Sequence, residues 1–289
     1  MAWLPPLLFR GKSRDRPVVR WPTRTSPVDV LPGPAVPGAV GLFQFLLGRG
    51  FKDLAGRGID LVCPPRCVFC RTDATGGGQA VVCSDCRRLL TCDLVRCSLC
   101  GAPAPVAGSC TSCRGRWRAW DGIVVLGGYT DDLRQAVLAA KRPSGELVVA
   151  GLSTLLWDKH QATLSAWRLD LVVPVPMHWT RRAARGLSAA QELARRLAAS
   201  LSVPCRVPLR RIRSTRMQNE LPPAERRANV RGVFRSSTAV AGRRVLLVDD
   251  VTTTGATLAE CREALTAAGA KAVHAAVVAR ADRSGSEID

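Results

Sequence analysis

Residues 244–258 read RVLLVDDVTTTGATL, and the rest of the chain is best understood from this stretch. Val245–Val248 is a run of consecutive apolar residues, which is typical of a strand buried on both faces of a parallel sheet. Asp249 and Asp250 follow at the carboxyl end of that strand, where open α/β sheets bind ligands. Residues 252–257 then turn into a helix. The stretch therefore predicts a βα unit with a polar turn.

The polar turn has the composition of an anion-binding site. Backbone N–H groups at a helix N-terminus, together with threonine hydroxyls, can surround a phosphate, and Gly255 allows close approach. Two adjacent carboxylates would repel that anion unless they bind something else, such as sugar hydroxyls or a divalent cation. The combination predicts a phosphorylated sugar as the ligand. The alternative is an ordinary βα unit whose turn is merely polar.

From Asp121 onward, predicted strands and helices alternate. Ser188 is placed to cap a long helix, with Gln191 in the capping-box position, and Gly269 is placed to end the helix that follows Gly255. Such alternation predicts an α/β fold with a doubly wound, mainly parallel sheet. The other expected elements are strands over 123–129, 169–176, 207–212 and 272–280 and a helix over 131–141.

Eight of the twelve cysteines form two groups of paired C-x2-C motifs. Each pair places two thiolates in a tight turn, and two pairs complete a closed, structural zinc site with four thiolates. A region this poor in large apolar residues needs the metal to fold. The first group is Cys67, Cys70, Cys83 and Cys86, and the second is Cys97, Cys100, Cys110 and Cys113.

The remaining cysteines have simpler interpretations. Cys63 and Cys92 are either spare thiols or substitute ligands, whereas Cys205 and Cys261 lie in apolar surroundings and are expected to be small core residues.

The formal net charge of +19 suits nucleic acid, anionic phosphates or an acidic partner surface. The scarcity of aromatic residues argues against a base-stacking platform. No apolar run approaches the roughly 20 residues that span a bilayer, so we expect no membrane insertion and a cytoplasmic protein. In that reducing compartment the cysteines favour metal over disulfides.

These motifs, taken in order, resemble those of the ComF family, the phosphoribosyltransferase-like proteins associated with bacterial competence. The stretch 244–258 closely resembles the 5-phosphoribosyl 1-pyrophosphate (PRPP) signature of type I phosphoribosyltransferases. The resemblance covers about residues 61–281 and implies an amino-terminal double zinc ribbon followed by a type I phosphoribosyltransferase fold. It is carried by the four cysteine pairs, residues 129–141, 173–178 (VPVPMH), 185–186, 218–234 (QNELPPAERRANVRGVF) and 244–258.

With this resemblance, the chain divides into four expected parts. Residues 1–58 form a disordered, Pro- and Arg-rich tail, 59–118 the double zinc ribbon, 119–282 the phosphoribosyltransferase-like domain and 283–289 a polar tail. The first tail is either a basic extension for nucleic acid or dispensable sequence translated from a start codon assigned too far upstream.

The resemblance also implies roles for individual residues. Asp249 and Asp250 bind the ribose hydroxyls of PRPP, the turn at Val175 and Pro176 faces the pyrophosphate, and Mg²⁺ bridges pyrophosphate and ribose oxygens. Lys141 and Arg185 are candidates for neutralising the departing pyrophosphate, the alternative being ordinary solvated cations. His178 either contacts phosphate or is a loop residue. The 5-phosphate is held by Thr253, Thr254, Gly255, Ala256 and Thr257.

Two stretches depart from the family pattern. Arg185-Gly186 is usually followed by an aromatic residue and then Asn-Gln, but here Leu187-Ser188-Ala189 follows. The family's Leu-Lys appears here as Ala140-Lys141, followed by Arg142-Pro143-Ser144-Gly145. The binding motif is therefore intact, whereas the part that would shape a nucleophile pocket is altered, and the sequence does not specify the acceptor.

A strongly basic segment precedes the signature, with arginines at 210, 211, 213, 216, 226, 227 and 231. It is a nucleic-acid surface, a solvated helix face or a mobile hood over the site. Three functions follow: a Mg²⁺-dependent phosphoribosyltransferase or PRPP-binding descendant, a nucleic-acid-binding competence accessory protein with a relict domain, and a zinc-dependent scaffold. The expected partners are PRPP and, for the second, single-stranded DNA or competence and recombination proteins.

Overall fold

The computed structural model describes residues 65–73, 81–91, 94–104, 110–113, 120–177, 188–213 and 230–281. The predictions for both tails, Cys63, Cys92, His178, Arg185 and most of residues 218–234 fall outside these ranges, and the domain boundaries stay predictions. No helix within the described ranges combines the length and the apolar character that crossing a membrane requires.

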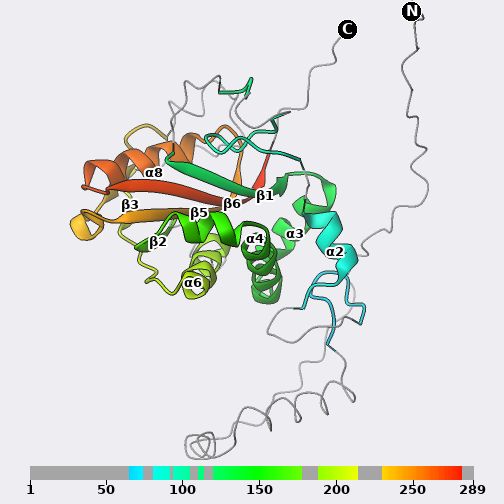
Figure 1. The fold of residues 1–289 in the computed structure, drawn as a ribbon. Helices are drawn as coiled ribbons and strands as arrows, with labels where there is room; N and C mark the ends of the chain where they lie inside the picture. Colours follow the sequence, from blue (N-terminus) through cyan, green and yellow to red (C-terminus); the bar gives the residue numbers. More distant parts are fainter. Residues whose placement is uncertain are drawn as a thin grey trace, which may run out of the picture.

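Four parallel strands form the central sheet in the order β1-β6-β5-β2 (Figure 1). They are β1 (Gly122–Gly128), β2 (Leu171–Pro174), β5 (Arg244–Thr252) and β6 (Ala272–Arg280). A separate antiparallel pair joins β3 (Leu209–Arg211) to β4 (Phe234–Ser236). The apolar residues of β5 form a strand buried on both faces, as predicted, and β5 is paired with a neighbouring strand on each edge.

Helices cover both faces of the sheet, so the predicted doubly wound fold is confirmed (Figure 1). Side chains of β5 alternate between the faces: Leu246 and Val248 pack with one set of helices, and Leu247 packs toward the other side. The first face carries α3 (Asp131–Ala140), α4 (Glu146–Ala166) and α6 (Ala189–Leu201). The second carries α8 (Ala256–Ala267), the β3–β4 pair and the short 3-10 helix η2 (Thr238–Val240).

Several local predictions are confirmed in detail. The Ser188 hydroxyl accepts a hydrogen bond from the Gln191 N–H at 3.4 Å and caps α6. The last strand occupies the predicted residues, Cys261 is fully buried, and Gly269 follows α8 with a φ of 91°. Cys205 is a correction: it is only half-buried, because it lies in the segment that runs along the open edge of β2.

The 21-residue helix α4 was not predicted, and its surroundings explain why. Residues 149–153 are all buried, so no apolar stripe marks one face of the helix. The sheet covers one side of α4, while the first four-cysteine group packs against another. That group includes α2 (Ser84–Leu90) and contributes Cys67, Phe69, Cys86 and Leu90 to the same core cluster as α4.

Gly151 makes this contact possible. A Cβ built there would lie 2.5 Å from Val68 Cγ2 and 2.9 Å from Phe69 Cζ, which is closer than such atoms can approach. Gly151 thus lets the first four-cysteine group lie directly on α4.

Gly151→Ala should therefore destabilise the protein, although glycine to alanine within a helix normally stabilises it by about 1 kcal/mol. Overpacking of this kind costs roughly 1–3 kcal/mol. Thermal unfolding checks the sign, with Thr163→Ala, an exposed position of the same helix, as the control that should not lower Tm. A higher Tm for Gly151→Ala would contradict the packing.

Candidate functional site

The carboxyl ends of the parallel strands meet at one edge of the sheet, and the predicted site residues gather there. The turn after β2 stays beside β5 because the Val175 N–H donates to the Val248 carbonyl at 2.9 Å. Val175 and Pro176 are thereby held next to the strand that ends in the two aspartates. Arg185 lies outside the described residues, so its place in this site stays a prediction.

Lys141 and Asp250 form an ion pair at the centre of this edge. Lys141 follows the last turn of α3, and its Nζ lies 2.8 Å from Asp250 Oδ2. The two side chains are 30% and 22% exposed, so the pair is shielded from water without being sealed from it. Burial lowers the pKa of Lys141, but the charge and hydrogen bond of Asp250, together with Asp249 and Tyr129, outweigh burial and the pKa is raised. Lys141 therefore carries its positive charge at any physiological pH.

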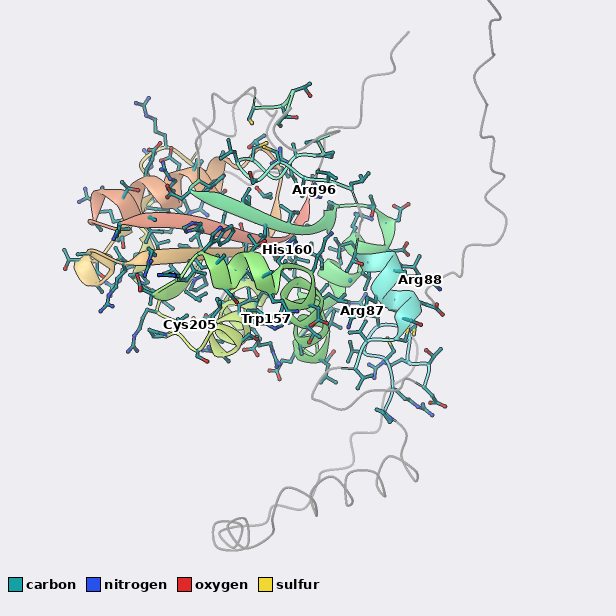
Figure 2. The ribbon with its side chains drawn as sticks, viewed as in Figure 1. Arg87, Arg88, Arg96, Trp157, His160 and Cys205 are labelled. Atoms are coloured by element: carbon teal, nitrogen blue, oxygen red, sulfur yellow. The ribbon has the colours of Figure 1, made fainter. Side chains whose placement is uncertain are left out.

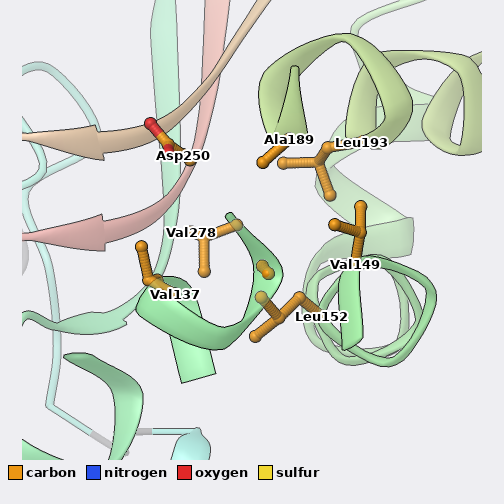
Figure 3. A pocket seen from close by; sticks show the side chains of 8 residues that line it. Val137, Val149, Leu152, Ala189, Leu193, Asp250 and Val278 are labelled. Carbon is orange, nitrogen blue, oxygen red and sulfur yellow. The ribbon is translucent and has the colours of Figure 1, made fainter. Parts of the chain in front are cut away.

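The floor beneath this ion pair is apolar. Asp250 lines a small pocket between the sheet and the helices α3, α4 and α6, and its other walls are aliphatic (Figure 3). Apolar walls strengthen a charge pair because they replace water, whose high dielectric constant would weaken the attraction. The aliphatic lining consists of Val137, Ala140, Val149, Leu152, Ala189, Leu193 and Val278.

Asp249 is in a different environment from its neighbour. Successive side chains of a strand point to opposite faces, so Asp249 lies toward α8 whereas Asp250 lies toward α3. The Asp250 N–H donates to Asp249 Oδ1 at 2.9 Å. Removal from water and the adjacent Asp250 carboxylate raise the pKa of Asp249 well above its ordinary value. The two acidic side chains thus differ in environment as well as in direction.

Residues 253–255 form the turn between β5 and α8, and Ala256 and Thr257 begin the helix. Gly255 occupies the N-cap position of α8 with a φ of 76°, a conformation that side chains disfavour. The N–H of Ala256 donates to Thr254 Oγ1 at 3.4 Å, while Gly255 has no side chain to occupy the other amides of the first turn. A Cβ built at Gly255 would meet nothing within 4 Å, so the turn faces open space. An uncapped helix N-terminus of this kind suits an anion.

Both four-cysteine groups have the geometry of a metal site. Within each group all four sulfur atoms lie within 4.8 Å of one another. The Sγ atoms of Cys70 and Cys83 are 3.6 Å apart, and those of Cys97 and Cys113 are 3.8 Å apart. A tetrahedral zinc ion with bonds of about 2.3 Å separates its sulfur ligands by about 3.8 Å. The residues present therefore fit zinc, as the cysteine spacing predicts.

Glu260 is a buried residue that sequence reasoning missed. It lies in α8, is 7% exposed, and accepts a hydrogen bond from the Gly232 N–H at 2.7 Å. This bond ties the end of the basic segment to α8. The apolar stripe of that helix passes through Leu258, Cys261 and Leu265, so a stripe alone could not find a buried carboxylate.

Comparison with known proteins decides the family. A family model for the phosphoribosyl transferase domain matches residues 149–289. The DNA utilization protein YhgH of Escherichia coli (strain K12) is 30% identical over 221 residues, which cover 74% of this chain and 96% of that protein. Competence protein F of Haemophilus influenzae is 29% identical over 224 residues, covering 75% and 97%. This chain belongs to the ComF family.

Solved structures add little to that assignment. A purine phosphoribosyltransferase from Pyrococcus horikoshii aligns with a TM-score of 0.30 and 17% identity, covering 45% of this chain and 82% of that one. An allosteric regulatory enzyme of purine biosynthesis aligns with a TM-score of 0.32 and 26% identity, covering 46% of this chain and 26% of that one. Because both scores are low, the ComF assignment rests on the sequence relatives.

The raised pKa of Asp249 predicts a stability cost in the ligand-free protein. The unfolded chain releases this proton near the ordinary pKa of 3.8, whereas the folded chain retains it to a higher pH. The folded state then binds more protons, so its stability falls as pH rises between the two pKa values. Asp249→Asn should therefore raise Tm above that of the wild type at neutral pH, and the difference should vanish below the unfolded pKa.

Asp250→Asn is the matched comparison, because it makes the same change at the next residue. There we expect a lower Tm at neutral pH, since Lys141 loses its partner 2.8 Å away. Thermal unfolding across pH checks both signs. A Tm for Asp249→Asn at or below wild type at neutral pH would count against the assigned environment of Asp249.

Proposed function

We propose that this ComF-family chain binds PRPP with Mg²⁺ at the carboxyl edge of the sheet and acts as a phosphoribosyltransferase. The observation that carries the proposal is the pairing of Lys141 with Asp250 beside an uncapped helix N-terminus. The helix N-terminus suits a phosphate, and the Lys141–Asp250 pair suits a sugar and a departing anion. The family membership supports the same ligand.

Each element has a role in the proposal. The turn at residues 253–257 holds the 5-phosphate with backbone N–H groups and threonine hydroxyls. Asp249 and Asp250 accept hydrogen bonds from the ribose hydroxyls, and the turn at Val175 and Pro176 faces the pyrophosphate. Mg²⁺, when bound, would neutralise phosphate charge, since it prefers phosphates and water to an all-protein cage.

Lys141 acts as the fixed cation for the leaving pyrophosphate. Preorganised charge contributes to catalysis because it needs no rearrangement as negative charge develops. The ion pair with Asp250 and the apolar floor hold Lys141 in place, and Arg185 is proposed as a second cation. The acceptor that attacks the ribose stays open, because the altered stretch Leu187-Ser188-Ala189 precedes α6 where an acceptor pocket would be shaped.

The four-cysteine groups are proposed as structural zinc sites. Their sulfur separations match a closed tetrahedral site, which leaves no position for a substrate. In the described part of the chain the cysteines are free of disulfides, which supports the proposed cytoplasmic location.

A thermal-shift measurement tests PRPP binding. Ligand that binds only the folded state stabilises it by about 2.7 kcal/mol at a concentration of 100 times Kd, so PRPP with Mg²⁺ should raise the wild-type Tm. Asp250→Asn should largely abolish that shift. Glu263→Gln, an exposed carboxylate on α8, should retain it. No wild-type shift at millimolar PRPP would refute a PRPP site.

A second candidate function, binding of single-stranded DNA, has its own observation. Arg210 and Arg235 are directly opposite each other across β3 and β4, and both are exposed. Like charges in opposed strand positions repel, so a polyanion would relieve an unfavourable pair. Arg206, Arg213 and Arg231 are exposed in the adjoining segments. The relatives' names, which refer to DNA utilization and competence, agree with such a partner.

The double variant Arg210→Glu and Arg235→Glu should weaken binding of single-stranded DNA and flatten its salt dependence, by a slope of about 0.7 per lost phosphate contact. Arg134→Glu with Arg243→Glu makes an equal charge change at exposed positions elsewhere. Fluorescence anisotropy at several salt concentrations compares the DNA affinity and the salt dependence of the two double variants. Equal losses in both double variants would mean that only net charge matters.

A further inference from the structure

Arg280 connects the second four-cysteine group to the sheet. It is the last residue of β6, and its guanidinium Nη1 donates a hydrogen bond to the carbonyl oxygen of Cys100. The turn after Cys100 lies directly on the strand below, because a Cβ at Gly101 would lie 2.7 Å from Val125 Cγ2. Arg280 therefore reaches from the carboxyl edge of the sheet into the backbone of a metal-binding turn.

The backbone of the same residue adjoins the start of residues 253–257, the proposed 5-phosphate site, which we call the phosphate turn. Arg280 is in register with Thr252, the buried last residue of β5 and the residue before Thr253. The Ala281 N–H donates to the Thr252 carbonyl at 2.8 Å, and the Tyr129 N–H donates to the Arg280 carbonyl at 2.6 Å. One residue thus bonds to the four-cysteine group through its side chain and adjoins the phosphate turn through its backbone.

The second group is also bonded to the edge strand β1, near the amino end of that strand. The Ile123 N–H of β1 donates to the Ser98 carbonyl at 2.8 Å. Within the group, Arg96 Nη1 donates to the Gly101 carbonyl at 2.9 Å, and Figure 2 shows Arg96 beside β1. A metal bound to Cys100 would therefore hold the carbonyl that Arg280 contacts.

The first group makes no comparable contact with the phosphate turn in the described residues. Besides its packing at Gly151, it is linked to the domain by Arg87 of α2 (Figure 2), whose Nη1 lies 2.7 Å from Asp158 Oδ2 of α4. The two groups thus provide a natural comparison, since each is tied to the domain by an arginine but only one arginine adjoins the site.

We propose that Arg280 is a positioning residue through which the second four-cysteine group holds the phosphate turn in its ligand-binding geometry. The inference rests on the proposed function in so far as the turn is the ligand site. Coupling of this kind is a free energy shared by two sites and acts in both directions. Loss of metal from the second group should therefore weaken binding of the phosphorylated ligand, and bound ligand should strengthen metal binding at that group by the same factor.

The test compares Arg280→Met, Arg280→Lys and Arg87→Met in the full chain. Methionine keeps the aliphatic packing and removes the donor, while lysine restores a donor. Three quantities are measured for each variant: zinc bound per chain, amide hydrogen exchange at Ala256 and Ala259 without ligand, and PRPP affinity with Mg²⁺. The Ala259 N–H bonds to the Gly255 carbonyl at 2.9 Å, so its exchange reports on the turn itself.

Arg280→Met should speed this exchange and weaken PRPP binding by roughly tenfold, within the usual range of coupling between sites. It should do so with both four-cysteine groups still loaded. Arg280→Lys should recover most of both properties, and Arg87→Met should leave the turn unchanged. Wild-type exchange and affinity in Arg280→Met would overturn the inference.

Failure of the proposed function has a different signature. If the wild type itself does not bind PRPP, the ligand assignment is wrong, and the exchange measurement still decides the coupling because it needs no ligand. If Arg280→Met loses zinc, the variant cannot be used. Amide exchange is then measured on wild-type protein from which zinc has been removed at the second group. Unchanged exchange at Ala256 and Ala259 in that sample would also overturn the inference.

Discussion

The parallel pairing of β5 with β2 on one side and β6 on the other is the constraint on which the rest of the structure depends. Because the three strands run in the same direction, their carboxyl ends meet and bring together segments far apart in the sequence. The turn after Val175, the turn after Thr252 and the end of β6 at Arg280 become neighbours only through this register. Lys141 joins them from α3 through its contact with Asp250. The fold thus assembles the site, and no single segment contains it.

Electrostatics explains why the site is poised for a ligand. Two adjacent carboxylates in partly apolar surroundings repel each other, and Lys141 pairs directly with Asp250. The pKa of Asp249 stays raised despite the nearby Lys141, because burial removes this group from water and the Asp250 carboxylate lies beside it. A bound sugar with its hydroxyls, and a cation bound with it, would supply partners that the ligand-free protein lacks. Local strain of this kind is common where binding, and not stability alone, determines the residues.

The sequence predicted what depends on local pattern and could not predict what depends on tertiary contact. The Ser188 cap, the limits of β6 and the glycine that follows α8 can be recognised from spacing along one segment, and all are confirmed. The helix α4 was missed because neighbours bury it on more than one side, which erases the expected stripe. Arg280 and Glu260 were missed for a related reason, since their partners lie 180 and 28 residues away in the chain. No spacing rule connects such positions.

The four-cysteine groups precede the domain in the chain, but they also pack against it and form part of its fold. An edge strand leaves backbone groups open to pairing with another chain, so folded proteins cover it. The segment around Cys205 runs along β2, where the Val172 N–H donates to the Pro204 carbonyl at 3.0 Å. The other edge, β1, receives the second four-cysteine group through Ser98, while the first group packs on the helices beside it. A metal that ordered the turns of the second group would therefore also help to cover the β1 edge of the sheet. Folding of the four-cysteine groups and order at the edges of the sheet therefore depend on each other.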